Sequence, residues 1–328
     1  MWHPRVICFL FLLSSKSFSV STEIDYTKKR LDLSDVETPV YSETLVDDTH
    51  DFLTKKVWLI SNTVDAFFTD AEVNENKNPG NARIWYEFFS EKGEDKIFRP
   101  DFRLKLYLRK TRKLLRINLS NTSIQQENSS RIDQNQVDGA TSNRDKKISA
   151  SVSKDVEVTK IYRFSSSIGA RLGWPLNTYI RLKNKINRDL SFARFYGNLD
   201  LYYYRESKSG CVFNLNLSGP IFKKSEWRVH QFYNFEELVD NNYGLGYQIF
   251  TYWNDDNSTS AQIGVNGLYS EGKHFTDEYY ISYNWRRNLY KKWLFFELTP
   301  NIKAKNDLDW KVYPGIYTKI ELFFGDLS

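Results

Sequence analysis

The segment from Ile161 to Tyr204 alternates in polarity with a period of two over three successive stretches. In the second stretch, Ile180 and Leu182 take one parity while Arg181 and Lys183 take the other. Successive side chains of a β-strand point to opposite faces of a sheet, so the pattern predicts one apolar face and one polar, largely basic face.

Two architectures can accommodate such strands. A soluble sandwich buries the apolar face, whereas a transmembrane barrel turns that face to lipid and the polar face to its lumen. Strands of globular proteins have about five or six residues, and a tilted strand that crosses a bilayer has about ten. Because the stretches here reach the longer length, they favour an all-β fold, a transmembrane antiparallel β-barrel.

Similar stretches recur over residues 82–328, which we interpret as the barrel domain. About fourteen strands can be counted, an even number that brings both chain ends to one side of the membrane. Twelve is the alternative, if the segments around Leu115 and Ala150 pair outside the barrel. With both ends periplasmic, the long polar loop 120–147 (Asn121 to Lys147) follows an outward strand and is expected to be extracellular. The other expected connections are outward loops at 236–242, 270–274 and 305–311 and inward turns at 154–155, 187–189 and 219–225.

Residues 1–21 have the features of a cleaved signal peptide. Arg5 precedes an apolar core from Val6 to Leu13, and Ser19 and Ser21 suit the positions that signal peptidase reads. A core strand or short helix is the alternative reading. No later apolar run reaches the roughly 18 residues of a spanning helix. We therefore expect export to the periplasm or outer membrane of a Gram-negative bacterium.

Residues 22–73 divide into a polar segment followed by a segment with helical spacing of apolar residues. Residues 22–50 are polar and charged, which predicts a disordered leader. Residues 51–73 are predicted to form a short amphipathic helix, because apolar residues recur at helical spacing. These are Phe52, Leu53, Val57, Ile60, Val64, Phe67 and Phe68. The helix could plug the barrel, lie on the membrane surface or cover one rim.

Composition argues against several function classes. The net charge is only +5, with both signs interspersed, so we expect no nucleic-acid partner. Of the two cysteines, Cys8 lies in the segment expected to be removed, which leaves Cys211 without an internal disulfide partner. The four histidines lack metal-ligand spacing, so we expect no metal and no cofactor. Nothing in the sequence specifies an oligomeric state.

Six basic residues share the polar parity of neighbouring strands. They form a candidate lumen-facing basic strip able to favour anions in a passive channel: Arg163, Arg171, Arg181, Lys183, Lys185 and Arg194. The alternative is that interior charges pair with one another and solvate a closed, structural barrel. The candidates for such pairing are Asp200, Glu278, Glu297, Lys319 and Glu321.

Two further functions stay open. An outer-membrane hydrolase of the phospholipase kind would need a base and a nucleophile within reach, and the best candidates are His230, His274 and Ser282. No GxSxG setting is present, so we name no catalytic residue. An adhesive or assembly anchor is the remaining possibility.

The C-terminal strand is amphipathic and ends in an aromatic residue. Ile316, Thr318, Ile320, Leu322 and Phe324 share one face, and this arrangement resembles the signal by which the barrel-assembly machinery recognises outer-membrane proteins. The chain departs from that signal by continuing for four residues, from 325 to 328.

The chain also resembles a family of uncharacterised outer-membrane proteins of Gram-negative bacteria. The likeness rests on Trp293-Leu294-Phe295-Phe296-Glu297, Pro300, Gly315 and Glu321 to Asp326, and on Val64-Asp65-Ala66-Phe67-Phe68 in the predicted helix. It implies a barrel in contact with outer-membrane lipid, and it brings no catalytic residue.

Overall fold

The computed structural model describes residues 45–69, 80–108, 115–121, 148–206, 208–237, 239–270 and 272–325. The predicted signal peptide 1–21, most of the leader and residues 122–147 of the predicted outer loop lie outside the described residues.

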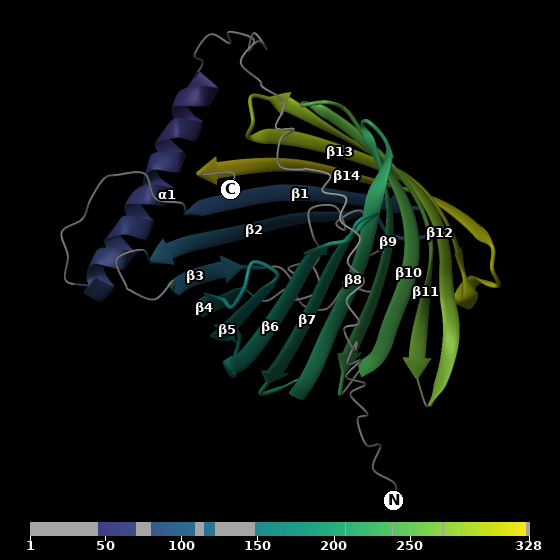
Figure 1. The fold of residues 1–328 in the computed structure, drawn as a ribbon, viewed down its shortest axis with the longest axis horizontal. Coiled ribbons are helices and arrows are strands. Elements are labelled where there is room, and N and C mark those ends of the chain that lie inside the picture. Colours follow the sequence, from purple (N-terminus) through teal and green to yellow (C-terminus); the bar gives the residue numbers. More distant parts are fainter. Residues whose placement is uncertain are drawn as a thin grey trace, which may run out of the picture. The chain divides into compact units, whose positions relative to one another are not determined.

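Over these residues, fourteen antiparallel strands form one closed barrel in which β1 pairs with β14 (Figure 1). The strands are β1 (Asn81–Glu91), β2 (Ile97–Leu108), β3 (Leu115–Ser120), β4 (Ser149–Glu157), β5 (Tyr162–Arg171), β6 (Asn177–Asp189), β7 (Arg194–Tyr204), β8 (Lys208–Phe222), β9 (Ser225–Glu236), β10 (Val239–Asn254), β11 (Asn257–Ser270), β12 (Lys273–Tyr290), β13 (Leu294–Lys305) and β14 (Val312–Gly325). A short 3-10 helix, η5 (Asn306–Leu308), joins the last two. The predicted barrel of about fourteen strands is confirmed, and β3 and β4 pair within it.

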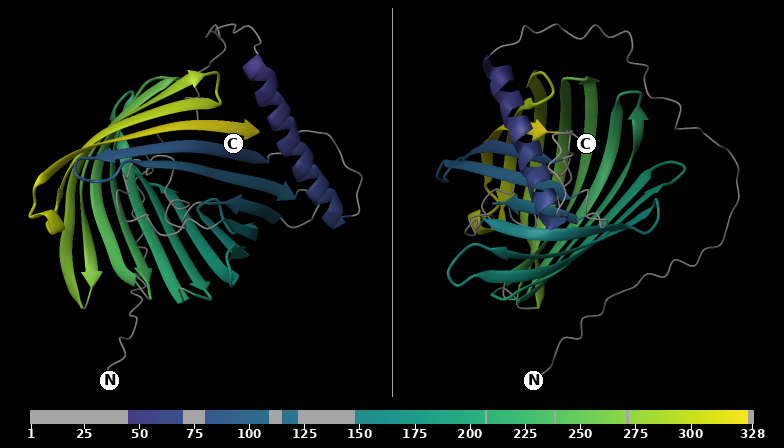
Figure 2. Two further views of the ribbon diagram at one scale, coloured as in Figure 1. Left: turned by 180° about the vertical axis from the view of Figure 1, so that it is seen from behind. Right: turned by 90° about the vertical axis from the view of Figure 1, so that its left-hand side faces the viewer.

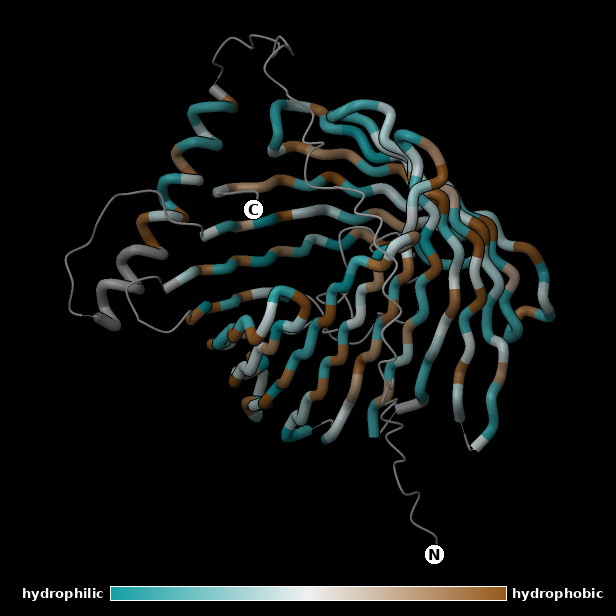
Figure 3. Tube along the Cα trace, in the orientation of Figure 1, coloured by the Kyte–Doolittle hydropathy of each residue, from teal (hydrophilic) through white to brown (hydrophobic). Residues whose placement is uncertain are grey.

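The faces of the sheet are inverted relative to a soluble protein. Ile180, Ile263 and Ile281 are exposed on the outer side of their strands. Asp200, Lys319 and Glu321 are buried on the inner side. Figure 3 shows the resulting alternation of hydrophilic and hydrophobic residues along the strands. Apolar side chains outside and polar side chains inside are the arrangement of a barrel that spans a membrane.

Several strands are longer than predicted, and their connections are correspondingly shorter. β8 continues to Phe222, so the expected inward turn at 219–225 shrinks to two residues. β4 and β6 run through the turns expected at 154–155 and 187–189. β10 already begins at Val239, within the expected outward loop 236–242. Backbone hydrogen bonding between neighbouring strands continues past the apolar band, where polar composition gives no sign of a strand.

One α-helix, α1 (Leu45–Thr69), precedes the barrel. It begins six residues before the predicted start at 51, so residues 45–50 are helical and do not belong to a disordered leader. Asp47 and Asp48 in its first turn complement the positive end of the helix dipole. Residues 70–73 of the predicted helix lie outside the described residues. Among the described residues, no helix combines the length and apolar character needed to cross a membrane.

The helix lies against one rim of the barrel. It contacts the ends of β14, β1 and β2, and both views of Figure 2 place it across those strand ends. The Nε2 atom of His50 donates a hydrogen bond to the carbonyl of Phe323 at 2.9 Å. The backbone N–H of Gly325 donates to the Thr54 hydroxyl at 3.3 Å. Of the three predicted positions, these contacts match the helix that covers a rim.

Candidate functional site: the inner wall of the barrel

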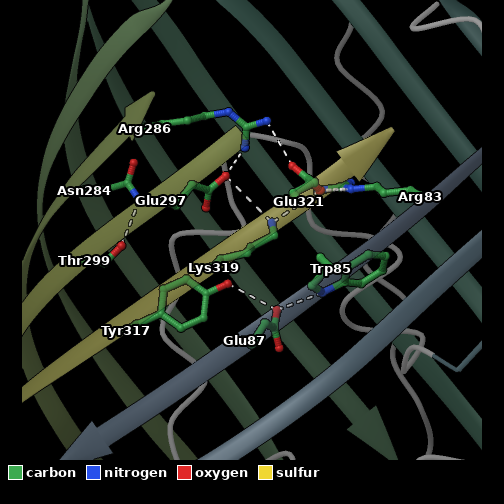
Figure 4. A network of polar contacts seen from close by, with 10 residues as sticks. All are labelled: Arg83, Trp85, Glu87, Asn284, Arg286, Glu297, Thr299, Tyr317, Lys319 and Glu321. Atoms are coloured by element: carbon green, nitrogen blue, oxygen red, sulfur yellow. Dashed lines mark hydrogen bonds and ion pairs between the residues drawn. The ribbon is translucent and has the colours of Figure 1, made fainter. Parts of the chain in front are cut away.

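A network of ion pairs crosses the seam where β1 meets β14. Arg83 on β1 pairs with Glu321 on β14, and Arg286 on β12 pairs with Glu297 on β13 and with Glu321. The ammonium group of Lys319 lies 3.8 Å from Glu297 and 3.6 Å from Glu321. Figure 4 shows these side chains converging from four strands. The network therefore links the first and last strands through their side chains as well as their backbones.

A second group extends this network along the seam. Glu87 accepts hydrogen bonds from the Trp85 indole at 3.1 Å and from the Tyr317 hydroxyl at 3.2 Å (Figure 4). Arg99 on β2 forms an ion pair with the same carboxylate at 3.2 Å. Glu87 thus joins side chains from β14, β1 and β2.

Lysines and glutamates continue the pattern toward the opposite rim. Lys303 lies 3.6 Å from Glu91 and 3.5 Å from Glu278. Lys305 lies 3.0 Å from Glu91 and 2.6 Å from Glu94. We call the ion-paired residues of this region the paired wall. Its six cations and six carboxylates are Arg83, Arg99, Arg286, Lys303, Lys305, Lys319, Glu87, Glu91, Glu94, Glu278, Glu297 and Glu321.

The six residues of the predicted basic strip lie on β5, β6 and β7, a region that we call the basic wall. The strand register pairs Arg163 with Lys185 and Lys183 with Asp200. Directly opposed residues share a face. Because Asp200 is fully buried on the inner side, Lys183 belongs to the same inner face. The register likewise pairs Arg171 with Asn177, which is buried beside the inward-facing Tyr179 and Arg181.

Ion pairing in the basic wall is sparse. Arg181 pairs with Asp200, with its Nε atom 2.8 Å from the carboxylate, and Lys183 is 4.0 Å from the same group. At the strand ends, Arg194 pairs with Asp189 at 2.9 Å, and Arg163 lies 3.8 Å from Glu157. Both of these end pairs are more than half exposed.

Arg171 and Lys185 have no ion-pair partner among the described residues. The guanidinium of Arg171 instead lies 4.0 Å from the centre of the Tyr204 ring. Lys185 stands opposite Asn198, a buried residue whose amide nitrogen and oxygen have no hydrogen-bond partner within the described ranges. Within the described part of the basic wall, Arg171 and Lys185 therefore have no carboxylate partner, and the amide of Asn198 makes no hydrogen bond.

Sequence reasoning named Asp200, Glu278, Glu297, Lys319 and Glu321 as possible partners for the basic strip. The structure brings only Asp200 to that strip; the other four belong to the paired wall. The paired wall was missed because its residues are far apart in the chain: Arg83 and Glu321 are 238 positions apart. The signal available in the sequence was the polar parity of β14, with Lys319 and Glu321 on one face.

Five glycines on the inner face lie directly opposite rings of the neighbouring strand. A Cβ atom added at any of them would come within 2.1 to 2.6 Å of the opposing ring. The pairs are Gly169 with Tyr179, Gly210 with Tyr202, Gly244 with Phe232, Gly246 with His230, and Gly264 with Tyr280. Each ring covers the glycine beside it, so it lies along the wall and does not stand across the interior.

The residues considered for hydrolase chemistry occupy separate strands. His230 lies on β9 and Ser282 on β12, with β10 and β11 between them. The Nε2 atom of His230 is 3.2 Å from the Gln262 amide nitrogen and 3.5 Å from the Tyr280 hydroxyl. His274, near the start of β12, packs against Tyr243 and Tyr269. His230 thus lies among amide and phenol groups of the neighbouring strands and is separated from Ser282.

Comparisons with known proteins support the fold. Neither protein-family models nor curated proteins gave a match. Among solved structures, a loop-deletion mutant of OmpT, an outer membrane protein of Vibrio cholerae, is similar with a TM-score of 0.51 and 6% identity, covering 75% of this chain and 98% of that one. A bacterial polysaccharide outer membrane secretin gives 0.47 and 9%, covering 76% and 99%. OccK11 of Pseudomonas aeruginosa gives 0.44 and 8%, covering 76% and 96%. The similarity to the OmpT variant supports the closed barrel fold.

Proposed function

We propose that this protein is a passive outer-membrane channel whose interior favours anions. It would reach that membrane through cleavage of the signal peptide 1–21 and insertion by the barrel-assembly machinery. The observation that carries the proposal is the basic wall, which presents six cations on the inner face of a closed barrel and leaves Arg171 and Lys185 without ion-pair partners among the described residues.

Two features of the structure support conduction, one on the inner wall and one at the rim. Rings that cover glycines lie along the wall, so these bulky residues do not extend toward the barrel axis. Helix α1 bonds to the rim through His50 and Thr54, which favours a position beside the opening over one inside it. A fourteen-stranded barrel is intermediate between small barrels filled by side chains and the wide porins of about 16 to 18 strands.

The anion preference follows from how the charges are distributed. In the paired wall each cation lies beside a carboxylate, so the fields of the two signs largely cancel at a distance. In the basic wall, the six cations have Glu157, Asp189 and Asp200 as their ion-pair partners among the described residues. A wall with unmatched positive charge lowers the energy of an anion that passes it and raises that of a cation.

The test is the reversal potential of the purified full-length protein in a planar bilayer under a salt gradient. We expect the wild type to conduct with an anion preference and Arg171→Gln/Lys185→Gln to lose most of that preference. Lys223→Gln/Lys292→Gln is the matched control, because it removes two positive charges from turns of the barrel. An absence of conductance from correctly inserted protein would refute the channel, and equal effects of the two double variants would refute the role of the basic wall.

A further inference from the structure

Helix α1 bonds to the barrel through one narrow polar face. Asp47, His50 and Thr54 are three and four residues apart, which places them on the same side of the helix. Asp47 accepts a hydrogen bond from the Tyr290 hydroxyl at 2.7 Å and forms an ion pair with Lys291 at 2.6 Å. His50 also stacks on Trp293, with ring centres 4.5 Å apart. His50 also stacks on Phe324, with ring centres 5.4 Å apart. The rim contacts of Asp47, His50 and Thr54 are therefore hydrogen bonds, an ion pair and two aromatic stacks.

Five apolar side chains of the helix lie away from this contact. Val46, Leu53 and Ile60 are seven residues apart and form a stripe along the helix, and Phe52 and Leu59 lie about 100° around the helix from it. All five are between 40 and 57% exposed. A helix of a soluble protein buries such a stripe against its own core, whereas the described residues of this chain leave the stripe uncovered.

The outer surface of the adjoining strands indicates which environment the stripe meets. Ile84 and Tyr86 on β1 and Ile320 on β14 are exposed on the outward face of the barrel, which contacts lipid in a membrane-spanning barrel. Helix α1 is bonded to the last residues of β14, immediately beyond this face. The exposed stripe thus continues the lipid-contacting surface of the barrel at its rim.

The geometry points to α1 as an interfacial helix that inserts its apolar stripe into the lipid leaflet at the barrel rim. The stripe would lie at the boundary between headgroups and acyl chains, the depth at which amphipathic helices bind in the plane of a membrane. Lys56 suits this position, because its ammonium lies 5.2 Å over the Phe52 ring and its long stem can carry the charge to the headgroups. This inference concerns lipid binding and does not depend on conduction through the barrel.

The test measures how deeply single positions of the full chain enter the bilayer. With Cys8→Ser and Cys211→Ser as background, a fluorophore is attached to Leu53→Cys on the stripe or to Lys55→Cys on the exposed polar side. Ile180→Cys on the outer face of β6 is the reference for lipid contact. The protein is reconstituted into phosphatidylcholine vesicles whose acyl chains carry bromine close to the headgroup. We expect quenching at position 53 to exceed that at position 55 about threefold.

Controls separate lipid binding from the alternatives. Strong quenching at position 180 establishes that the barrel has inserted, so a folding failure cannot imitate a negative result. With insertion established, equal and weak quenching at positions 53 and 55 would overturn the proposal. Energy transfer between labels at position 53 on different copies, without lipid quenching, would also overturn it and assign the stripe to a second copy. Replacing Leu59 and Ile60 by Asn should reduce quenching at position 53 and leave position 180 unchanged.

Discussion

The paired wall and the basic wall are built from the same strand pattern but are held together differently. In the paired wall, buried Glu297, Lys319 and Glu321 connect β12, β13, β14 and β1 through charges. In the basic wall, the buried cluster of Tyr179, Tyr202, Tyr204 and Val212 supplies packing, and Asp200 is the buried carboxylate. The difference indicates that matched charges connect the strands at the seam, whereas ring packing contributes more in the basic wall. Under the proposed function, the cations of the basic wall are the ones available to solutes.

The position of the seam explains this division. Strands β1 and β14 are brought together from opposite ends of the barrel sequence, so closing them is the pairing with the largest loss of chain entropy. Ion pairs between Arg83 and Glu321 and a hydrogen bond from Tyr317 to Glu87 add specific contacts at this place. The strands of the basic wall are sequence neighbours joined by short turns, and they need less reinforcement.

Glu321→Gln is expected to have the largest effect. The substitution removes the charge that Arg83, Arg286 and Lys319 share in a fully buried position. Leaving buried charges without their partner costs about 3–5 kcal/mol. Urea unfolding in lipid vesicles, followed by tryptophan fluorescence, would measure the change in the free energy of unfolding.

Asp189→Asn is the matched control for this substitution. It also removes one carboxylate from an ion pair, but Asp189 and Arg194 are 79% and 65% exposed. Exposed pairs contribute about 0–1 kcal/mol. If both variants lose the same stability, the paired wall does not hold the seam and the contrast between the two walls fails.

Gly169→Ala tests the packing of the basic wall and should rank second. The added Cβ atom would lie 2.5 Å from the carbonyl oxygen of Ala150 and 2.6 Å from the Tyr179 ring. The backbone contact cannot be relieved by a side-chain rotation, and overpacking of this kind costs about 1–3 kcal/mol. The same urea titration would detect it.

Gly197→Ala, on the outer face of β7 opposite Ile186, provides the comparison in a neighbouring strand. Its nearest contact would be 3.5 Å, to the Phe195 ring, which is ordinary van der Waals distance. We expect its stability to stay within about 0.5 kcal/mol of the wild type. A loss as large as that of Gly169→Ala would show that glycine at these positions matters for reasons other than the rings.

The sequence specified the faces of the barrel better than its contacts. Alternation over Ile161 to Tyr204 predicted barrel strands with one apolar and one polar face, because the two-residue period of a strand is fixed by backbone geometry. It could not predict that Arg181 bonds to Asp200 while Lys185 has no ion-pair partner in the described part of the chain, since this depends on the register between strands. The glycine and ring pairs likewise require the register, which no local pattern reveals.

The start of helix α1 shows a second limit of prediction from the sequence. Apolar spacing located the helix from residue 51 onward, and the structure places its start at Leu45. The added first turn contains Asp47, whose bonds to Tyr290 and Lys291 are made with residues more than 200 positions away. A polar turn that is fixed by tertiary contacts resembles a disordered leader when the sequence is read alone.

The ion pair between Lys291 and Asp47 allows the same comparison at the rim. Breaking it by raising the pH should have the smallest effect of those considered, a change in the motion of α1. The hydrogen bond and charge of Asp47 raise the pKa of Lys291 above its ordinary value. A raised pKa means that the contact stabilises rim docking fully at a pH below the ordinary lysine pKa of about 10.4, and that this contribution is lost as the pH rises through the raised value. A nitroxide label at Lys55→Cys would report the change as faster motion of α1 between about pH 8 and pH 11.5.

Lys291→Gln decides whether this ion pair is the cause. The variant lacks the titrating group, so the motion of the label should no longer respond to pH across that interval, while the bonds of His50 and Thr54 keep the helix at the rim. A pH response that persists in Lys291→Gln would have to come from another group. The rim contact would then depend on titration elsewhere, and the ion pair of Lys291 with the buried Asp47 would contribute little to it.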